Sequence, residues 1–192
     1  MNFKRMFYFL LMPACFLAGC GECEKLNLNQ TEKDWVSHFK KGEIIFYKNT
    51  NGQIDTLEIK DTSNYYTSCN KIELSYYQYE IYLVLYKFKS KNNYNGEESS
   101  ISISTQESEQ RMPYIHLCNL GPHRNDLENK APVLIDTVLG GVKLSSVYYY
   151  AKGLNTEQYG TKEYFKNFFW NKQSGLVAYT TINDELFLLV NQ

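Results

Sequence analysis

Apolar and polar residues alternate in short runs from Glu43 to the end of this 192-residue chain, and turn residues separate the runs. Residues 44–47 are apolar, Asn51-Gly52 follows, and residues 54–59 resume the alternation. Asn-Gly between two apolar runs is the strongest short-range signal of a β-hairpin, because a type I′ turn needs positive φ at both central residues. A period of two over most of the chain predicts a mainly β fold.

Residues 81–88, Ile-Tyr-Leu-Val-Leu-Tyr-Lys-Phe, are apolar on both faces of a strand, which indicates a central strand covered on each side. The same reasoning predicts strands and hairpins over residues 72–76, 101–105, 133–135 with 142–150, 164–170 with 176–181, and 186–190. Residues 161–169 fit a strand or a helix, because Phe165, Phe168 and Phe169 would also share a helical face. Strands at turn-punctuated intervals predict antiparallel sheets, as a sandwich or an open half-barrel.

One short helix is expected before the strands. Thr31 precedes Glu32-Lys33-Asp34 in a pattern that resembles a capping box, and Trp35 and Phe39 fall on one helical face. Residues 20–30 are polar and unpatterned, as a short tether would be. The aromatic fraction of 16% and the presence of only four Pro favour a packed β-rich domain over residues 31–192.

The amino terminus has the layout of an export signal. Lys4 and Arg5 form a positive segment, and residues 6–16 are apolar except for Pro13. The apolar run is shorter than the ~20 residues that a membrane-spanning helix needs. We therefore expect residues 1–19 to be a signal peptide, and a permanent membrane span is the less favoured alternative.

Leu17-Ala18-Gly19-Cys20 closes this leader and resembles the lipobox of bacterial lipoproteins. The resemblance implies that a diacylglyceryl group is attached to the Cys20 sulfur and that a peptidase cuts before Cys20. Two or three acyl chains, at roughly 0.8 kcal/mol per buried methylene, would keep the mature protein on the membrane. The residue after Cys20 is Gly21. In enterobacterial lipoproteins an Asp at this position resembles a signal for retention in the inner membrane, so the expected location of this chain is the outer membrane of the cell envelope.

The carboxyl-terminal pattern, Ser174-Gly175-Leu176 to Tyr179 and then Leu186-Phe187-Leu188, resembles the ends of small uncharacterised lipoproteins of Bacteroidota. The richness in Asn, Lys, Ile and Tyr fits that origin. This resemblance implies an envelope location and no reaction.

The charge balance excludes nucleic acid as an expected partner. Without the leader the chain keeps 18 basic and 21 acidic residues, and affinity for phosphate backbones needs clustered Lys and Arg. Seven tyrosines have two interpretations, as a stacking platform for a glycan or as ordinary packing residues of strands. These are Tyr65, Tyr66, Tyr76, Tyr77, Tyr79, Tyr82 and Tyr86. The expected partners are the membrane, through the anchor, and a glycan, an apolar ligand or an envelope protein.

Three cysteines remain once Cys20 is acylated, namely Cys23, Cys69 and Cys118. An exported chain meets an oxidising compartment, so a disulfide is plausible. Cys69 and Cys118 lie in the folded region and Cys23 lies in the tether, so the predicted pair is Cys69–Cys118. The alternative is that all three thiols stay reduced.

His116, Cys118 and His123 form the best candidate for a reactive cluster. On a strand, His116 and Cys118 would project from the same face and supply half of a zinc site, but zinc needs three or four preorganised ligands. A buried Cys beside a His-bearing loop is the simpler interpretation. Nucleophile-elbow, zinc-protease, phosphate-loop and dinucleotide motifs are absent from the sequence.

We therefore predict no catalytic residue, no metal and no cofactor. The sequence favours a lipid-anchored envelope protein with a binding or structural role. The alternative is a small hydrolase or metal-dependent enzyme centred on His116, Cys118 and His123.

Overall fold

The computed structural model describes residues 23–69, 77–89, 98–105, 114–118, 120–121, 132–152, 154, 157–158 and 164–190. Its elements are β1 (Glu24–Leu26), α2 (Gln30–Lys33), β2 (Ile44–Asn49), β3 (Ile54–Tyr66), β4 (Tyr77–Phe88), β5 (Glu98–Ser104), β6 (Tyr114–His116), β7 (Leu120–Gly121), β8 (Val133–Leu139), β9 (Val142–Ala151), β10 (Glu157–Gln158), β11 (Phe165–Asn171), β12 (Gly175–Thr181) and β13 (Leu186–Leu189).

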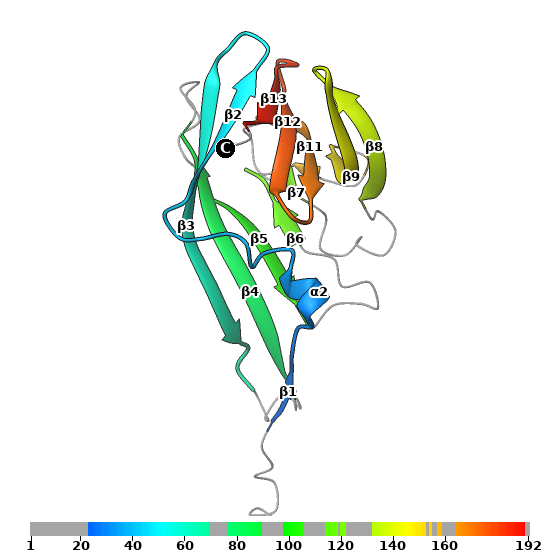
Figure 1. The fold of residues 1–192 in the computed structure, drawn as a ribbon. Coiled ribbons are helices and arrows are strands. Elements are labelled where there is room, and N and C mark those ends of the chain that lie inside the picture. Colours follow the sequence, from blue (N-terminus) through cyan, green and yellow to red (C-terminus); the bar gives the residue numbers. More distant parts are fainter. Residues whose placement is uncertain are drawn as a thin grey trace, which may run out of the picture.

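Antiparallel pairing joins most of these strands into one curled sheet in the order β6-β5-β4-β3-β2-β13-β12-β11-β9-β8 (Figure 1). The predicted mainly β, antiparallel fold is confirmed, and the arrangement is the half-barrel. The β4 strand lies between β3 and β5, which confirms the predicted central strand, but the sequence predicted cover on both faces, and Ile81, Leu83 and Leu85 on the second face are only half-buried. Val84, Tyr86 and Phe88 of β4 are buried on the concave side.

The predicted hairpins are present because their turns carry the required residues. Asn49 Oδ1 of the β2–β3 hairpin accepts hydrogen bonds from the amides of Asn51 (3.0 Å) and Gln53 (2.9 Å). Of these turn residues only Gly52 has positive φ, at 82°, so the turn is not the type I′ expected from Asn-Gly. Gly140 and Gly141 both have positive φ between β8 and β9, where two consecutive glycines allow it.

Residues 165–171 are the strand β11, which resolves the choice between strand and helix for this part of residues 161–169. The aromatic side chains of β11 alternate across the sheet, and both Phe165 and Phe168 are buried on its concave side. The strand predicted at residues 72–76 lies outside the described residues.

An aromatic cluster fills the concave side of the sheet. Tyr179 of β12 lies 4.9 Å from Phe165, 5.5 Å from Phe88 and 5.4 Å from Tyr47, measured between ring centroids. Buried tyrosine hydroxyls need partners, and here Tyr179 donates to Asp55 Oδ2 at 2.5 Å while Tyr47 donates to the Leu176 carbonyl at 2.9 Å. Contacts between the two halves of the sheet thus hold its curl, as between Phe88 of β4 and Phe165 of β11, whose centroids lie 5.2 Å apart.

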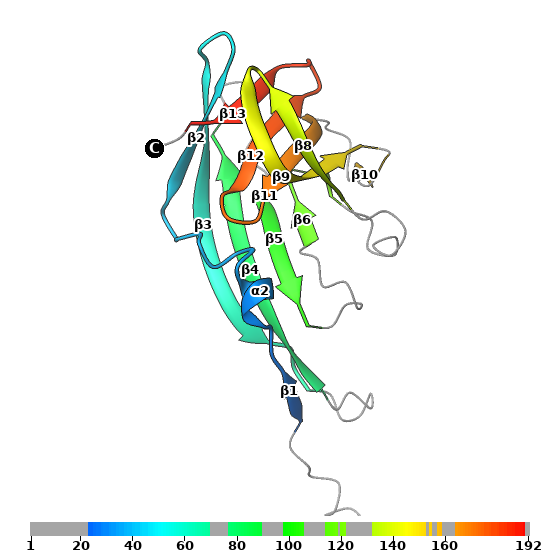
Figure 2. The same ribbon diagram turned by 45° about the vertical axis from the view of Figure 1, so that its right-hand side comes forward.

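The amino-terminal segment covers the remaining open part of the sheet. It contains the single helical turn α2, which lies against β4 and β5 in both views (Figure 2). The cap is Asn29 instead of the predicted Thr31, and Glu32 completes the capping box. A longer helix that presents Trp35 and Phe39 on one face is not shown, although both side chains are buried. Among the residues described, no helix is long and apolar enough to span a membrane.

Residues 23–29 belong to the folded domain, whereas the sequence predicted a tether through residue 30. The β1 strand pairs in parallel with β4, with Glu24 opposite Tyr77 and Leu26 opposite Tyr79. Glu80 of β4 accepts hydrogen bonds from the Leu28 amide at 2.7 Å and pairs with Lys33 Nζ at 2.8 Å. Polar residues that look unpatterned in sequence are therefore matched to partners far along the chain.

Candidate functional site

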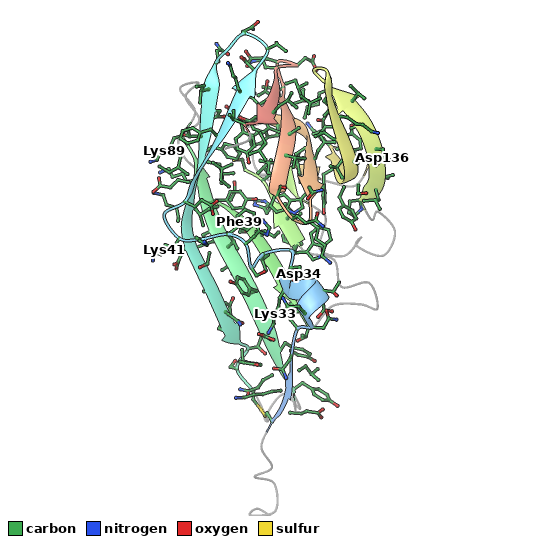
Figure 3. The ribbon with its side chains drawn as sticks, in the orientation of Figure 1. Lys33, Asp34, Phe39, Lys41, Lys89 and Asp136 are labelled. Atoms are coloured by element: carbon green, nitrogen blue, oxygen red, sulfur yellow. A yellow bond between two sulfur atoms is a disulfide. The ribbon has the colours of Figure 1, made fainter. Side chains whose placement is uncertain are left out.

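A pocket of about 480 Å³ lies where the segment after α2 meets β2, the β11–β12 turn and the end of β13. Its volume is within the range of ordinary small-molecule pockets. Its lining residues combine an apolar wall with several polar groups, and they are His38, Phe39, Glu43, Ile45, Gln173, Ser174, Leu189 and Val190. Figure 3 labels Phe39, which lies between the lower strands and the carboxyl-terminal hairpin.

Gly175 determines how closely the β11–β12 turn approaches this pocket. Its φ is +71°, and a Cβ built there would lie 2.5 Å from Phe39 Cζ and 3.4 Å from His38 Nε2. Any side chain would displace the Phe39 ring, which also contacts Trp170 at 5.9 Å between centroids. Glycine therefore allows the turn and the two rings to pack together.

His38 has unused hydrogen-bonding capacity. Both ring nitrogens are buried and make no hydrogen bond of good geometry among the described residues, although the Asp34 backbone lies close enough to the ring to affect its pKa. Burial lowers the pKa of His38, and this effect outweighs the Asp34 backbone and the Glu43 carboxylate, which both raise it. The imidazole is thus favoured in its neutral form, with one donor and one acceptor nitrogen. Leaving such a group unsatisfied costs roughly 1–3 kcal/mol, and a ligand hydroxyl would reach it only after the ring turned toward the pocket.

Ser174 and Glu43 line the same pocket as His38, but they are not arranged as a catalytic triad. Nucleophilic catalysis requires a hydrogen bond between the nucleophile and its base, and none joins Ser174 to His38 in the described structure. The Glu43 carboxylate instead accepts the Lys40 amide at 3.1 Å. The geometry suits binding better than acyl transfer.

The structure separates the predicted reactive cluster. The β6 strand ends at His116, and Cys118 lies in the following turn with φ of 40°, so the two side chains are not neighbours on one strand face. The Cys118 thiol is buried, and Ser99 Oγ donates to its sulfur at 3.1 Å. The half-exposed His116 packs against Gly121, where a Cβ would lie 2.7 Å from the ring. The third member, His123, lies outside the described residues.

A disulfide joins Cys23 to Cys69, with 6.3 Å between the Cα atoms. This bond corrects the predicted Cys69–Cys118 pairing. The physical reason is the parallel addition of β1 to β4, which brings the start of the described chain beside the end of β3. Cys20, the expected lipidation site, lies outside the described residues.

The tyrosines proposed as a glycan platform do not share one face. Tyr86 is buried on the concave side, Tyr82 is half-buried, and Tyr65, Tyr66 and Tyr77 are exposed near β1. Tyr76 is outside the described residues. Sequence reasoning also missed His38, because a single His beside Phe39 has no spacing that marks it.

Among the described residues, no three His, Cys, Asp or Glu side chains are grouped as a metal ion would require. No family model, no curated protein and no solved structure matches this chain.

Proposed function

We propose that this protein is a lipid-anchored lipoprotein of the cell envelope, similar to small lipoproteins of Bacteroidota, that binds a small ligand in the pocket around His38. The observation that carries the binding role is this pocket, which is lined by a half-buried, neutral imidazole whose ring nitrogens make no hydrogen bond of good geometry among the described residues. The anchor is supported by Leu17-Ala18-Gly19-Cys20 after a charged and apolar leader. Gly21 favours the outer membrane.

The pocket lining favours a ligand with one apolar face and several hydroxyl groups. Phe39, Ile45 and Leu189 supply apolar contact, while Gln173 and Ser174 of the β11–β12 turn offer polar groups for hydrogen bonds. A sugar ring has this combination, because its C–H face packs on an aromatic ring and its hydroxyls both donate and accept. We therefore propose a short glycan as the ligand, in preference to a purely apolar molecule.

Titration calorimetry with short oligosaccharides, and separately with fatty acids, tests the binding role. We expect an oligosaccharide to bind the wild-type chain, His38→Ala to weaken binding about tenfold through the loss of roughly 1.4 kcal/mol, and His38→Gln to retain part of it. Lys166→Ala on the surface is the control and should bind as the wild type does, because its ion pair with Asp184 lies outside the pocket. Binding of fatty acids alone, or equal binding by His38→Ala, would contradict the proposal.

The anchor has its own test. Cys20→Ser should abolish incorporation of labelled palmitate and leave the precursor uncleaved. Mass spectrometry of the wild-type membrane form should find Cys20 as the acylated first residue. Retention of residues 1–19 on that form would show that the leader is not a lipoprotein signal.

A further inference from the structure

We propose that the domain stands on the membrane with one defined end, whose exposed tyrosines insert into the lipid headgroup region. This end, called the base, consists of residues 24–26 of β1, 64–66 of β3 and 77–79 of β4. The inference rests on the proposed function, because it requires the lipid anchor at Cys20. It adds the surface that meets the bilayer and the orientation of the whole domain.

The chain between the anchor and the base is too short to act as a free tether. Cys20 is three residues before Cys23, which spans at most about 11 Å when fully extended. Cys23 is bonded to Cys69, and the next residue begins β1, so the chain has no further slack. Headgroup regions are roughly 5–8 Å deep on each side of a bilayer. Acyl chains on Cys20 therefore bring the base to the headgroups.

The base lies at one tip of the molecule, as both ribbon views show (Figures 1 and 2). The β2–β3 hairpin and the β8–β9 turn lie at the opposite tip. With the base on the membrane, the long axis of the β3–β4 pair would rise away from the bilayer. Phe39, which lines the pocket, would then lie between the base and the opposite tip, at a distance from the lipid (Figure 3).

Three large aromatic side chains are exposed at the base, with 45% of Tyr65, 37% of Tyr66 and 43% of Tyr77 accessible. Tyr65 lies opposite Ile81 and Tyr66 lies opposite the buried Glu80, so neighbouring tyrosines project from the two faces of the sheet. Tyr77 shares the convex face with Tyr65, by the period of two along β4. The three exposed tyrosines therefore lie on both faces of the sheet at the base and do not form one flat patch.

Tyrosine is the residue type that such a location favours. Its ring is apolar and its hydroxyl is wet, which is why Tyr and Trp gather at membrane–water interfaces. The charged residues among those of the base are Glu24 and Lys25, whose charges offset each other, and Lys25 Nζ lies 5.1 Å from the centroid of the Tyr66 ring. The described residues of the base therefore favour aromatic docking, and we expect it not to require anionic lipid.

Tryptophan scanning of the lipidated full chain tests this orientation. Tyr65→Trp and Tyr77→Trp report on the base, and Ile54→Trp and Val138→Trp report on exposed positions of the opposite tip. Each variant is reconstituted in phosphatidylcholine vesicles, with and without brominated acyl chains, and again with phosphatidylglycerol added. The native Trp35 and Trp170 are buried, so the wild-type chain supplies the background.

We expect brominated lipid to quench the added fluorescence at positions 65 and 77 and to leave that at positions 54 and 138 unchanged. The quenching should be the same with and without phosphatidylglycerol. Palmitate labelling of each variant is measured in parallel. Normal labelling with no quenching at the base would overturn this inference alone, whereas absence of lipid on wild-type Cys20 would overturn both the anchor and the inference.

A glycan surface is the remaining outcome for the tyrosines. Two results together would show that the base is a glycan-binding surface and that the membrane assignment is wrong. Insoluble peptidoglycan would retain the wild-type chain but not the Tyr65→Ser, Tyr77→Ser double variant, and brominated lipid would not quench the fluorescence of Trp at position 65.

Discussion

Glu80 is the residue whose removal should most weaken the attachment of the amino-terminal segment to the sheet. Its side chain is 3% exposed and carries three interactions, with the Leu28 amide at 2.7 Å, with Asn64 Nδ2 at 2.9 Å and with Lys33 Nζ at 2.8 Å. Burial by itself would raise the pKa of Glu80, but the partners Lys33, Asn64 and Leu28 together lower it. The carboxylate is therefore ionised and fully engaged.

Glu80→Ala leaves three donors without an acceptor. Breaking one partner of a buried ion pair costs about 3–5 kcal/mol, and the 30% exposure of Lys33 lets water compensate in part, so we expect about 3 kcal/mol. In a domain of this size that lowers the melting temperature by roughly 6–12 °C. Glu80→Gln keeps one acceptor oxygen, but its amide nitrogen replaces the other oxygen and faces a donor, so its cost should be about 2 kcal/mol, below that of Glu80→Ala.

Urea unfolding of residues 21–192, followed by circular dichroism, measures these costs. The matched control is Asp61→Asn on the sheet surface, where Asp61 pairs with Lys41 at 3.0 Å and both side chains are exposed. Solvent screens that pair, so stability should change little. A Glu80→Ala chain as stable as Asp61→Asn would refute the assignment of Glu80 as the main attachment.

The pH dependence gives a second check on Glu80. Its folded pKa lies below the unfolded value of about 4.3, so its contribution is present above that pH and is lost as the pH falls through the lowered pKa. The difference in stability between the wild type and Glu80→Gln should therefore shrink in acid. A difference that grows below pH ~4 would show the wrong sign.

Two further predictions concern the disulfide and the buried Asp55. Reduction of Cys23–Cys69, or Cys23→Ser, opens a loop closed across 46 residues and should lower the free energy of unfolding by about 4 kcal/mol in the chain-entropy model. Thermal melts with and without reductant measure this effect, and an unchanged melting temperature would argue against the bond. Burial raises the pKa of Asp55 despite its hydrogen bonds from Tyr179 and the Thr56 amide, so its contribution to stability falls as pH rises above about 3.9. Asp55→Asn should remove this pH dependence from the urea midpoint. The same pH dependence in both chains would contradict the burial argument.

The hairpins could be predicted because their signals are local. Gly52, Gly140 with Gly141, and Asp184 all have positive φ in turns that the sequence marks with Asn, Asp or Gly. The apolar character of residues 81–88 likewise predicted the central strand β4, although only one of its two faces is fully buried. The type of the β2–β3 turn was wrong, because the Asn49 side chain organises the loop and a two-residue rule does not include it.

The cysteine pairing and the pocket could not be predicted in the same way. Cys23 meets Cys69 because β1 pairs with β4 in parallel, and nothing near Cys23 in the sequence marks that pairing. His38 joins the pocket because Gly175 lets a hairpin more than a hundred residues later approach it. Both depend on the order of strands in the sheet.

The sequence by itself determined the period of two, the turns and the expectation of an exported, anchored chain, since each of these depends on residues within a few positions of one another. The tertiary structure decided the closure of the half-barrel, the partner of Cys69, the burial of Glu80 and the setting of His38. The reason is physical: hydrogen bonding and apolar alternation specify a strand and one buried face, but many strand orders satisfy them equally. Only side-chain packing across distant segments, such as Tyr179 on Tyr47 and Phe88, selects among those orders.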